Sequence, residues 1–404
     1  MGTKIILILG LVSTVRLFAQ SGCTDPQAIN FDASAQFNDG SCQYAPSTHT
    51  PTLLQNLSPV LKENSGMVVW NNHIWMLNDG GSLPMLLKLD LNGNIVDSLV
   101  LTSATNVDWE ALTQSSTHLY IGDFGNNAGN RTDLAIYEVS KQDVLASTTH
   151  EVSSIKRTFN YADQALFNGP TNGHAFDCEA FYYDQDSLVM LTKNWNNLYT
   201  KRYRFPTLWQ DTLSISHIDS MFVDGLITDV SIDAPSKRVV ALGYKNNGSN
   251  FYTSFVYVFF DFLGSNIFSG NKRRIELGNM LSLGQTEGIA WQDSVHAFIS
   301  SEQIASIITI PPKLFSTDFT TYFNGNAGLN ETTQSVTVHP NPGNGFIYIP
   351  NEFTGETVRI YSAMGTFIIE KPVENEGRID LGGLAVGTYV IKAGAFHARF
   401  IKID

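Results

Sequence analysis

Basic residues and long apolar runs are both scarce in this chain of 404 residues. Lys and Arg number 25 against 38 Asp and Glu, which gives a net charge of −13, and no basic cluster interrupts this excess. We therefore exclude nucleic acid and anionic membranes as partners, and cations or neutral polar ligands fit better. The apolar run Ile5–Val12 is far shorter than the roughly 20 residues that cross a bilayer, so we expect no transmembrane segment.

Sequence signatures of several enzyme classes are also missing. The chain has no Gly-x-Ser-x-Gly elbow, no His-Glu-x-x-His zinc motif, no phosphate-binding glycine loop and no dinucleotide fingerprint. Conventional serine hydrolases, zinc peptidases and nucleotide enzymes are therefore disfavoured.

The amino-terminal residues have the pattern of a secretory signal. Lys4 precedes the apolar run and Phe18-Ala19-Gln20 is typical of a cleavage site, so we predict a signal peptide over residues 1–20. The mature chain should then reach an oxidising compartment, where paired cysteines form disulfides.

Two of the three cysteines bracket a short segment that follows this signal. Residues 21–44 are too few to fold around a core of their own, so we predict that a Cys23–Cys42 disulfide staples them. The segment resembles the small Gly-Cys-Thr-Asp-Pro to Gly-Ser-Cys modules of exported bacterial proteins, and we read residues 45–51 after it as a linker.

Hard oxygen donors in a turn-forming context occur within this module. The carboxylates are Asp25, Asp32 and Asp39. Such donors are those that calcium prefers, and the sequence predicts a calcium site here. The equal alternative is that they only form Asx-turns.

Strand patterning runs through almost all of residues 52–320. Ile74-Trp-Met-Leu, Leu119-Tyr-Ile and Phe255-Val-Tyr-Val-Phe-Phe are examples of β-rich runs separated by Asn, Gly, Asp and Ser turns. No convincing amphipathic helix interrupts them, so the fold class is all-β.

An acid-led phrase, followed by a strand, a turn and a second strand, recurs five times in this region. The copies begin at Glu63, Glu110, Glu179, Asp229 and Glu287, at spacings of 47, 69, 50 and 58 residues. Periods of this kind, with about four strands each, indicate a β-propeller, and we predict five blades with six as the alternative. The strand Thr52–Leu57 would complete the last blade and close the ring.

Hairpin geometry predicts where the repeated acids lie. In an antiparallel hairpin the start of the first strand lies beside the end of the second, so each acid should meet the polar residues that end its second strand, Lys193 among them, at one mouth of the propeller. The predicted ligand-binding residues are Glu63, Asp79, Asp108, Glu110, Asp123, Glu179, Asp229, Glu287 and Glu302. The equal alternative is that each acid accepts backbone N–H bonds from the next blade and only helps to close the ring.

The histidines divide into two groups by the same geometry. His73, His118 and His296 begin second strands and should lie at the turn end, away from the acids. His174 lies in the loop that leads to Glu179, where it is a candidate base or ligand, with a surface role as the alternative.

Strand alternation and loop position also predict where two other side chains near this region lie. Cys178 alternates away from Glu179 and should pack between blades as a small apolar residue. Trp195 is the one tryptophan expected at the mouth, whereas the tryptophans within the repeated strands should pack between blades.

The last seventy or so residues form a separate region after a linker over residues 321–334. Pro340-Asn-Pro-Gly-Asn-Gly, Val358-Arg-Ile-Tyr-Ser-Ala-Met-Gly and Leu381-Gly-Gly-Leu-Ala-Val-Gly-Thr-Tyr389 are strand and turn phrases that predict a small β-sandwich over residues 335–404. They resemble the C-terminal sorting domain of type IX secretion. The resemblance implies that the secretion machinery is a partner and that the protein reaches the cell surface or the extracellular space.

The first two propeller repeats also resemble a known group. Glu63-Asn-Ser-Gly-Met, Asp108-Trp-Glu-Ala-Leu and Tyr120-Ile-Gly-Asp-Phe-Gly-Asn-Asn are similar to SdiA-regulated bacterial propellers and, more remotely, to propeller phytases and their esterase-like relatives. The resemblance supports the fold more than an activity. The calcium or ligand contacts that it implies are Glu63, Asp79, Asp108, Glu110 and Asp123, of which all but Asp108 are expected metal ligands.

Three hypotheses for the function follow. The leading one is a secreted or surface-exposed propeller that binds an unknown extracellular ligand at the acidic mouth, with calcium as cofactor. The rival is a metal-dependent hydrolase of phosphoesters or lactones, with Glu110, Glu179 or His174 as the candidate catalytic residues. The third is a structural or adhesive surface protein.

Overall fold

The computed structural model describes residues 20–248, 251–305, 309–323, 338–362, 367–393 and 396–403. Apart from Gln20, the predicted signal peptide lies outside the described residues, as does most of the predicted linker at 321–334. The chain divides into two compact units, residues 1–325 and 326–404.

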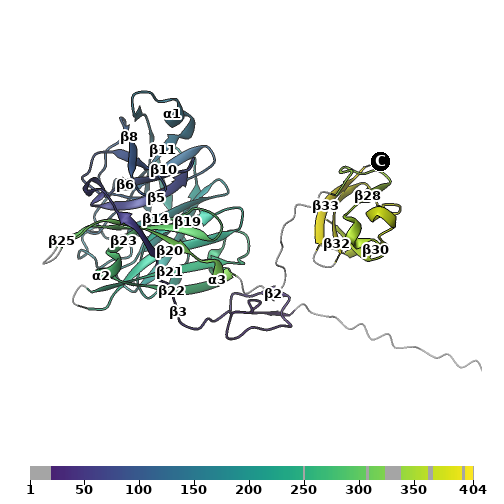
Figure 1. Ribbon diagram of the computed structural model, residues 1–404. Helices are drawn as coiled ribbons and strands as arrows, with labels where there is room; N and C mark the ends of the chain where they lie inside the picture. The colour runs from purple at the N-terminus through teal and green to yellow at the C-terminus, as the bar shows by residue number, and fades with distance from the viewer. Residues whose placement is uncertain are drawn as a thin grey trace, which may run out of the picture. The chain divides into compact units, whose positions relative to one another are not determined.

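Five sheets of four or five strands make up most of the first unit, within the residues described (Figure 1). The first sheet contains β5 (Asn64–Trp70), β6 (His73–Asn78), β7 (Met85–Leu89), β8 (Ile95–Leu101) and β12 (Glu151–Val152). The second contains β9 (Trp109–Gln114), β10 (His118–Asp123), β11 (Ala135–Ser140), β13 (Ile155–Tyr161) and β17 (Thr212–Ile215). The third contains β14 (Asp177–Asp184), β15 (Ser187–Lys193), β16 (Tyr199–Pro206) and β18 (His217–Phe222).

The last two sheets also take up strands from the amino-terminal part of the chain. The fourth contains β19 (Leu226–Asp233), β20 (Arg238–Asn246), β21 (Tyr252–Phe260), β22 (Asn271–Asn279) and β3 (Ser47–Thr48). The fifth contains β23 (Gln285–Trp291), β24 (His296–Glu302), β27 (Lys313–Asp318) and β4 (Thr52–Asn56). The predicted closing strand therefore does pair into the last sheet. The predicted linker at 45–51 is not free chain, because Ser47 and Thr48 pair in parallel with Ile275 and Glu276.

The sheets are arranged as the blades of a propeller. Their first strands contact one another in the closed order β5, β9, β14, β19, β23 and back to β5. Figure 1 labels β5, β14, β19 and β23 in the middle of the first unit. A separate apolar core fills each of the five interfaces between neighbouring blades, with Trp75 and Trp109 in one and Trp291 in another. These tryptophans are therefore packing residues, as predicted, and the all-β propeller is confirmed.

Local sequence explains how the first hairpin turns in the first and third blades, at the end of the strands away from the mouth. Asn71 and Asn72 link β5 to β6 with φ of 51° and 60°, and Gln185 and Asp186 link β14 to β15 with φ of 47° and 59°. Two successive left-handed residues are the type I′ turn that suits the twist of a two-residue hairpin. His73 begins β6 directly after such a turn, which puts it at the turn end as expected.

Helices are short wherever the structure describes the chain. They are α1 (Lys141–Ala146), α2 (Met280–Leu283) and α3 (Thr320–Phe323), with 3₁₀ turns η1 (Pro59–Leu61), η2 (Ile267–Ser269), η3 (Asn351–Phe353) and η4 (Asn375–Gly377). A small hairpin, β25 (Ile304–Ala305) with β26 (Thr309–Ile310), extends from the fifth blade, and β1 (Ser21–Gly22) pairs with β2 (Phe37–Asn38) in the amino-terminal module. No helix in the described residues is long and apolar enough to cross a membrane.

The second unit consists of two small sheets around a core of its own. One pairs β28 (Phe346–Tyr348) with β31 (Arg378–Asp380), and the other has the order β30 (Phe367–Pro372), β29 (Thr357–Ser362), β32 (Gly387–Ala393) and β33 (Phe396–Lys402). Ile347, Val358, Ile360 and Phe400 lie in the core between them. This is the predicted β-sandwich.

The innermost strand of each blade carries a β-bulge at its second or third residue. In four blades the pairing register between the first and second strands shifts along the first strand, between Asn64 and Gly66, Cys178 and Ala180, Ile227 and Asp229, and Thr286 and Gly288. In the second blade it shifts between Gly122 and Asp123 of the second strand, which leaves Glu110 of the first strand unpaired. The bulged residues are Ser65, Glu110, Glu179, Thr228 and Glu287. A bulge leaves one residue unpaired and re-aims its side chain, so these five positions are equivalent around the ring.

The residue after the bulge in the first blade has no room for a side chain. A Cβ on Gly66 would lie 2.7 Å from the backbone nitrogen of Leu112 and 2.8 Å from the Cα of Ala111, both on the next inner strand. Glycine therefore allows β5 and β9 to approach each other closely.

We predict that Gly66→Ala destabilises the propeller, because backbone atoms on both strands must move apart to admit the methyl group. The expected loss is about 1–3 kcal/mol, the usual range for overpacking. Gly169→Ala is the control, because nothing lies within 4 Å of its Cβ position. Urea unfolding of both variants tests this, and equal midpoints would contradict it.

Candidate functional site

A polar cavity of about 240 Å³ lies on the propeller axis where the first strands begin and the second strands end. Three bulged acids, Glu110, Glu179 and Glu287, reach its wall from β9, β14 and β23. Second strands add side chains at or directly after their ends. These are Asp79, Lys193 and Glu302. Five of the predicted acids are therefore brought together around one cavity.

The other predicted acids are not on its wall. Asp229 follows the bulged Thr228 by one residue, and its carboxylate accepts hydrogen bonds from the backbone N–H of Val230 (2.8 Å) and of Ile289 in the next blade (2.7 Å). A shift of one residue along a strand moves a side chain to the other face. Asp229 thus follows the alternative reading, in which the acid closes the ring.

Glu63 and Asp123 also lie outside the wall, for different reasons. Glu63 precedes the bulged Ser65 by two residues, and its half-exposed side chain contacts Lys62 at 3.3 Å. The carboxylate of Asp123 is buried and pairs with the guanidinium of Arg131 at 2.9 Å and with the backbone N–H of Asp108 at 3.1 Å. Both were expected metal ligands, but the structure engages them elsewhere.

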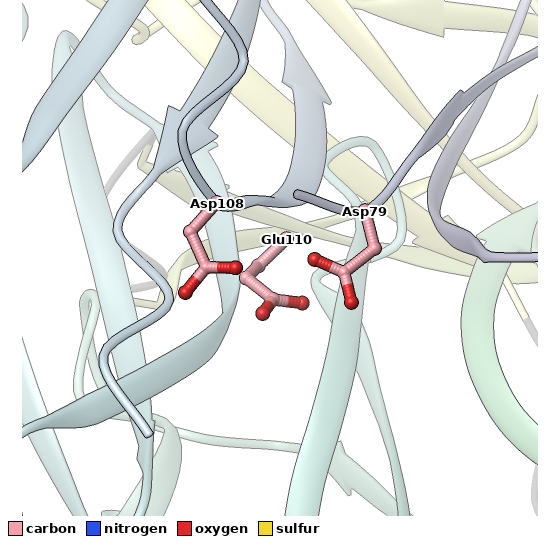
Figure 2. Close-up of side chains that lie close together, drawn as sticks. All are labelled: Asp79, Asp108 and Glu110. Carbon is pink, nitrogen blue, oxygen red and sulfur yellow. The ribbon is translucent and has the colours of Figure 1, made fainter. Parts of the chain in front are cut away.

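Three carboxylates converge at the edge of the cavity between the first and second blades. One oxygen each of Asp79, Asp108 and Glu110 lies within 4.8 Å of the others, and Figure 2 shows Glu110 between the two aspartates. Oxygens bound to one calcium at about 2.3–2.6 Å lie at most about 5.2 Å apart, so this spacing fits a single ion. We refer to these residues as the carboxylate triad.

The backbone is shaped closely around the triad. A Cβ on Gly125 would lie 2.5 Å from Oδ2 of Asp108 and 2.5 Å from Oε1 of Glu110. A Cβ on Gly80 would lie 2.5 Å from Oδ1 of Asp108. Two glycines thus leave space for the carboxylates to approach one another.

Burial opposes ionisation of the acids at the site. Desolvation, with Asp79 and Glu179 nearby, raises the pKa of Glu110 well above its usual range. Desolvation and the charge of Asp79 raise the pKa of Asp108 to about 7. Burial and the charges of Glu287 and Asp79 raise the pKa of Glu302 to about 9. Bound cations or protons must therefore neutralise part of this cluster.

Lys193 opposes these acids on the other side of the cavity. Its Nζ bonds Oε1 of Glu179 and lies 5.3 Å from the ring centroids of both Trp195 and Tyr244. Burial alone would lower the pKa of Lys193, but the negative charges of Glu179 and Glu287 outweigh it and raise the pKa well above its usual range. The ammonium group is therefore charged.

His174 joins two loops and does not line the cavity. Its Nε2 lies 3.1 Å from the carbonyl oxygen of Asn127, and its Nδ1 accepts from the backbone N–H of Phe176 at 3.1 Å. Both ring nitrogens are thus engaged by backbone groups. This arrangement positions the loops that bring Asn127 and Asn172 to the cavity wall.

Trp195 lines the cavity, whereas Cys178 does not. The indole Nε1 of Trp195 donates to Asp177 at 2.9 Å, which fixes the orientation of its ring. Cys178 is fully buried in the core between the second and third blades, and burial raises its pKa above the usual range. Its packing role is as predicted.

The amino-terminal module has the predicted Cys23–Cys42 disulfide. Its carboxylates are used locally: Asp25 accepts from Gln27 N–H (2.9 Å) and Tyr44 O–H (2.7 Å), Asp32 from Ser34, and Asp39 from Ser41 N–H (2.9 Å). Among the described residues the carboxylate triad is the sole group of three or more His, Cys, Asp or Glu side chains whose ligand atoms lie close enough together to hold a metal ion. The geometry of the module therefore follows the Asx-turn alternative.

Sequence reasoning missed part of the cavity wall. The missed residues are Ser65, Asn172, Tyr252 and Gln285. A signal for Ser65 existed, because Glu110, Glu179 and Glu287 are each followed by Ala or Gly, and so is Ser65. When the repeats are aligned on this Ala or Gly and not on the acid, Ser65 falls at the position of Glu110, Glu179 and Glu287. No comparable signal marks Asn172, Tyr252 or Gln285.

Comparison with known proteins identifies the second unit. Residues 337–402 match the family model described as a secretion system C-terminal sorting domain. The chain therefore carries the type IX sorting domain and is exported to the cell surface or the extracellular space. No curated protein matches the chain.

Several solved structures are remotely similar to the chain. The PQQ-bound form of an aldose sugar dehydrogenase from Streptomyces coelicolor is 7% identical with a TM-score of 0.41, over 68% of this chain and 99% of that one. An α-L-arabinofuranosidase from Podospora anserina in complex with cellotriose is 8% identical with a TM-score of 0.36, over 68% and 96%. A mannose phosphorylase from Leishmania mexicana is 8% identical with a TM-score of 0.38, over 69% and 91%. Similarity at this level says nothing about activity.

We predict that the propeller without added metal loses stability between pH 5 and pH 8. Asp108 and Glu302 have raised pKa values in the folded state, whereas carboxyls in an unfolded chain titrate near pH 4, so the folded state holds extra protons in this window. Stability therefore falls as pH rises, by at least about 2 kcal/mol. Urea unfolding in EDTA measures it.

The double variant Asp108→Asn, Glu302→Gln is the control for this prediction, since it removes both titrating groups. Its free energy of unfolding should vary less with pH over the same window. A wild-type stability that rises from pH 5 to pH 8 would show that the carboxyls are not buried as described.

Proposed function

We propose that the exported propeller binds a polar extracellular ligand in the axial cavity, together with a calcium ion held by Asp79, Asp108 and Glu110. The observation that carries this proposal is the convergence of the three carboxylate oxygens within 4.8 Å. Hard oxygen ligands at this spacing are what calcium coordination requires.

The state of Glu110 supports the same proposal. Its side chain is buried and lines the cavity, and desolvation together with the nearby Asp79 and Glu179 raises its pKa well above the usual range. Ionising such a carboxyl is costly, and a bound cation would offset that cost. The calcium would also present open coordination positions to oxygen atoms of a ligand.

The remainder of the wall suits a ligand that donates hydrogen bonds. Glu287 and Glu302 offer acceptor oxygens, Asn127 and Asn172 offer amides, and Trp195 and Tyr252 offer ring surface. At about 240 Å³ the cavity is smaller than the roughly 300–1,000 Å³ of pockets that bury drug-sized molecules. The ligand, or the part of it that enters, is therefore small.

We expect Glu110→Gln to weaken calcium binding by roughly tenfold or more, because the charge of the ligands sets the affinity of such sites. Isothermal titration calorimetry on the wild type and the variant measures this. Glu276→Gln, on outer strand β22 and paired with Arg274, is the matched control and should bind like the wild type. A wild type that binds no calcium, or an equal affinity in Glu110→Gln, would refute the metal site.

A metal-dependent hydrolase of phosphoesters or lactones is the second candidate. A buried carboxyl with a raised pKa beside a metal site is suited to moving a proton, and in this alternative Glu110 takes that role instead of binding the metal. Glu179 is less suited because Lys193 engages it.

This candidate predicts calcium-dependent turnover on a panel of such esters, lost by a factor of about 10² or more in Glu110→Gln. Spectrophotometric assays on aryl phosphates and aryl lactones test it, with Glu276→Gln as the active control. Absence of turnover on the whole panel leaves ligand binding as the function.

A further inference from the structure

The amino-terminal module packs against β22, the last long strand of the fourth blade. The side-chain amide of Asn38 donates to Oδ1 of Asn271 at 2.9 Å, and the ammonium of Lys272 donates to the carbonyl oxygen of Gly40 at 2.9 Å. A Cβ on Gly40 would lie 2.5 Å from the carbonyl oxygen of Ser269. The module and the blade therefore meet as closely as elements within one domain.

Gln27 connects the module to two parts of the propeller at once. Its Oε1 accepts from the guanidinium of Arg273 in β22, and its Nε2 donates at 2.9 Å to the carbonyl oxygen of Thr321 in α3, which follows the fifth blade in the chain. The same guanidinium lies 5.0 Å from the ring centroid of Tyr44 in the module and 4.8 Å from that of Tyr322 in α3. The module thus links the fourth blade to the end of the propeller chain.

Tyr44 extends this link into the apolar interior. It packs both against the small core of the module, formed by Cys23, Ala28 and Cys42, and against the core between the fourth and fifth blades. Its hydroxyl donates to the carboxylate of Asp25 at 2.7 Å, which fixes the ring from the module side. Because one side chain belongs to both cores, we expect the module to stabilise the interface between these blades.

The disulfide holds the two arms of the module in the arrangement that fits the blade. Gln27 lies shortly after Cys23, whereas Asn38 and Gly40 lie shortly before Cys42, so the docking groups come from opposite arms. The cysteines themselves are two of the three residues in the module core. With so little apolar surface to bury, the arms depend on the covalent bond to stay together.

We propose that the amino-terminal module is an oxidation-dependent clamp on the propeller. With Cys23 and Cys42 paired, the module ties the fourth blade to α3. With the bond reduced, the two arms separate, the clamp is released and the propeller is less stable. Closing the bond transfers two electrons and two protons from the thiols to a disulfide oxidant, and a dithiol reverses the step by becoming a cyclic disulfide itself.

The clamp links stability to the place where the protein resides. Disulfides persist in oxidising environments and are rare in the cytosol, where thiols are kept reduced. The sorting domain exports this chain, so its propeller has full stability only after the two cysteines have been oxidised. The described wall of the axial cavity includes no residue of the module, so the clamp does not depend on calcium or ligand.

Tryptophan fluorescence can test the clamp, because it reports on the propeller alone. All six tryptophans of the chain lie within the propeller: Trp70, Trp75, Trp109, Trp195, Trp209 and Trp291. We expect dithiothreitol to lower the urea midpoint of the full-length wild type by roughly 1 M. The double variant Cys23→Ala, Cys42→Ala should have the lower midpoint with and without dithiothreitol. Cys178 is already a free thiol, so the reductant does not change it.

Variants at the docking surface separate the clamp from the disulfide itself. Gly40→Ala places a methyl group against Ser269 at a residue whose φ is 75°, and Gln27→Ala removes the hydrogen bonds to Arg273 and Thr321. Both should lower the midpoint although the disulfide is intact. Gln36→Ala is the matched control, since Gln36 is an exposed residue of the same module, and it should unfold like the wild type.

Three results would overturn the clamp. The first is an unchanged wild-type midpoint in dithiothreitol when alkylation and mass spectrometry show both cysteines reduced. The second is a midpoint in the double cysteine variant equal to that of the oxidised wild type. The third is a wild-type midpoint in both Gly40→Ala and Gln27→Ala, which would show that docking of the module does not stabilise the propeller.

Discussion

Like charge buried on the propeller axis is the constraint on which this structure depends. Four of the five blades direct acids toward one small volume, and a lysine, backbone N–H groups and protons or cations offset the cost of that arrangement. In the first and fourth blades the bulged residue is Ser65 or Thr228 instead of an acid, and these hydroxyls donate to backbone carbonyls at 2.9 and 3.0 Å. The ring therefore keeps its backbone pattern while the charge varies from blade to blade.

The β-bulge is the local device that makes this possible. A regular strand would alternate its side chains between the two blade interfaces, whereas a bulged residue can point along the strand toward the axis. Glu110, Glu179 and Glu287 all occupy that position, and the residue after each is Ala or Gly. At the equivalent Gly66 of the first blade, a Cβ would meet the backbone of the next inner strand. Site and fold thus depend on the same few residues.

The sequence predicted the propeller, its closing strand, the sorting domain and the disulfide, because strand patterning, repeat spacing and cysteine pairing are local signals. It also predicted that the acids near hairpin starts and ends would meet. It misplaced Glu63 and Asp229, since aligning repeats on an acid ignores the bulge, and a difference of one or two residues decides which way a side chain points. Asn172 could not be predicted, because it reaches the cavity through a loop whose path only tertiary packing sets, and Tyr252 could not because it begins a third strand, β21, outside the repeated hairpins.

Closure of the last blade links parts of the chain that are far apart. Strand β4 at residues 52–56 pairs with β27 at residues 313–318, so the ring is complete only when nearly the whole propeller has been synthesised. Pairing over such a distance makes folding slow and unfolding a concerted event. For an exported protein, a closed ring of this kind raises the barrier to unfolding, and that barrier sets how long the fold lasts outside the cell.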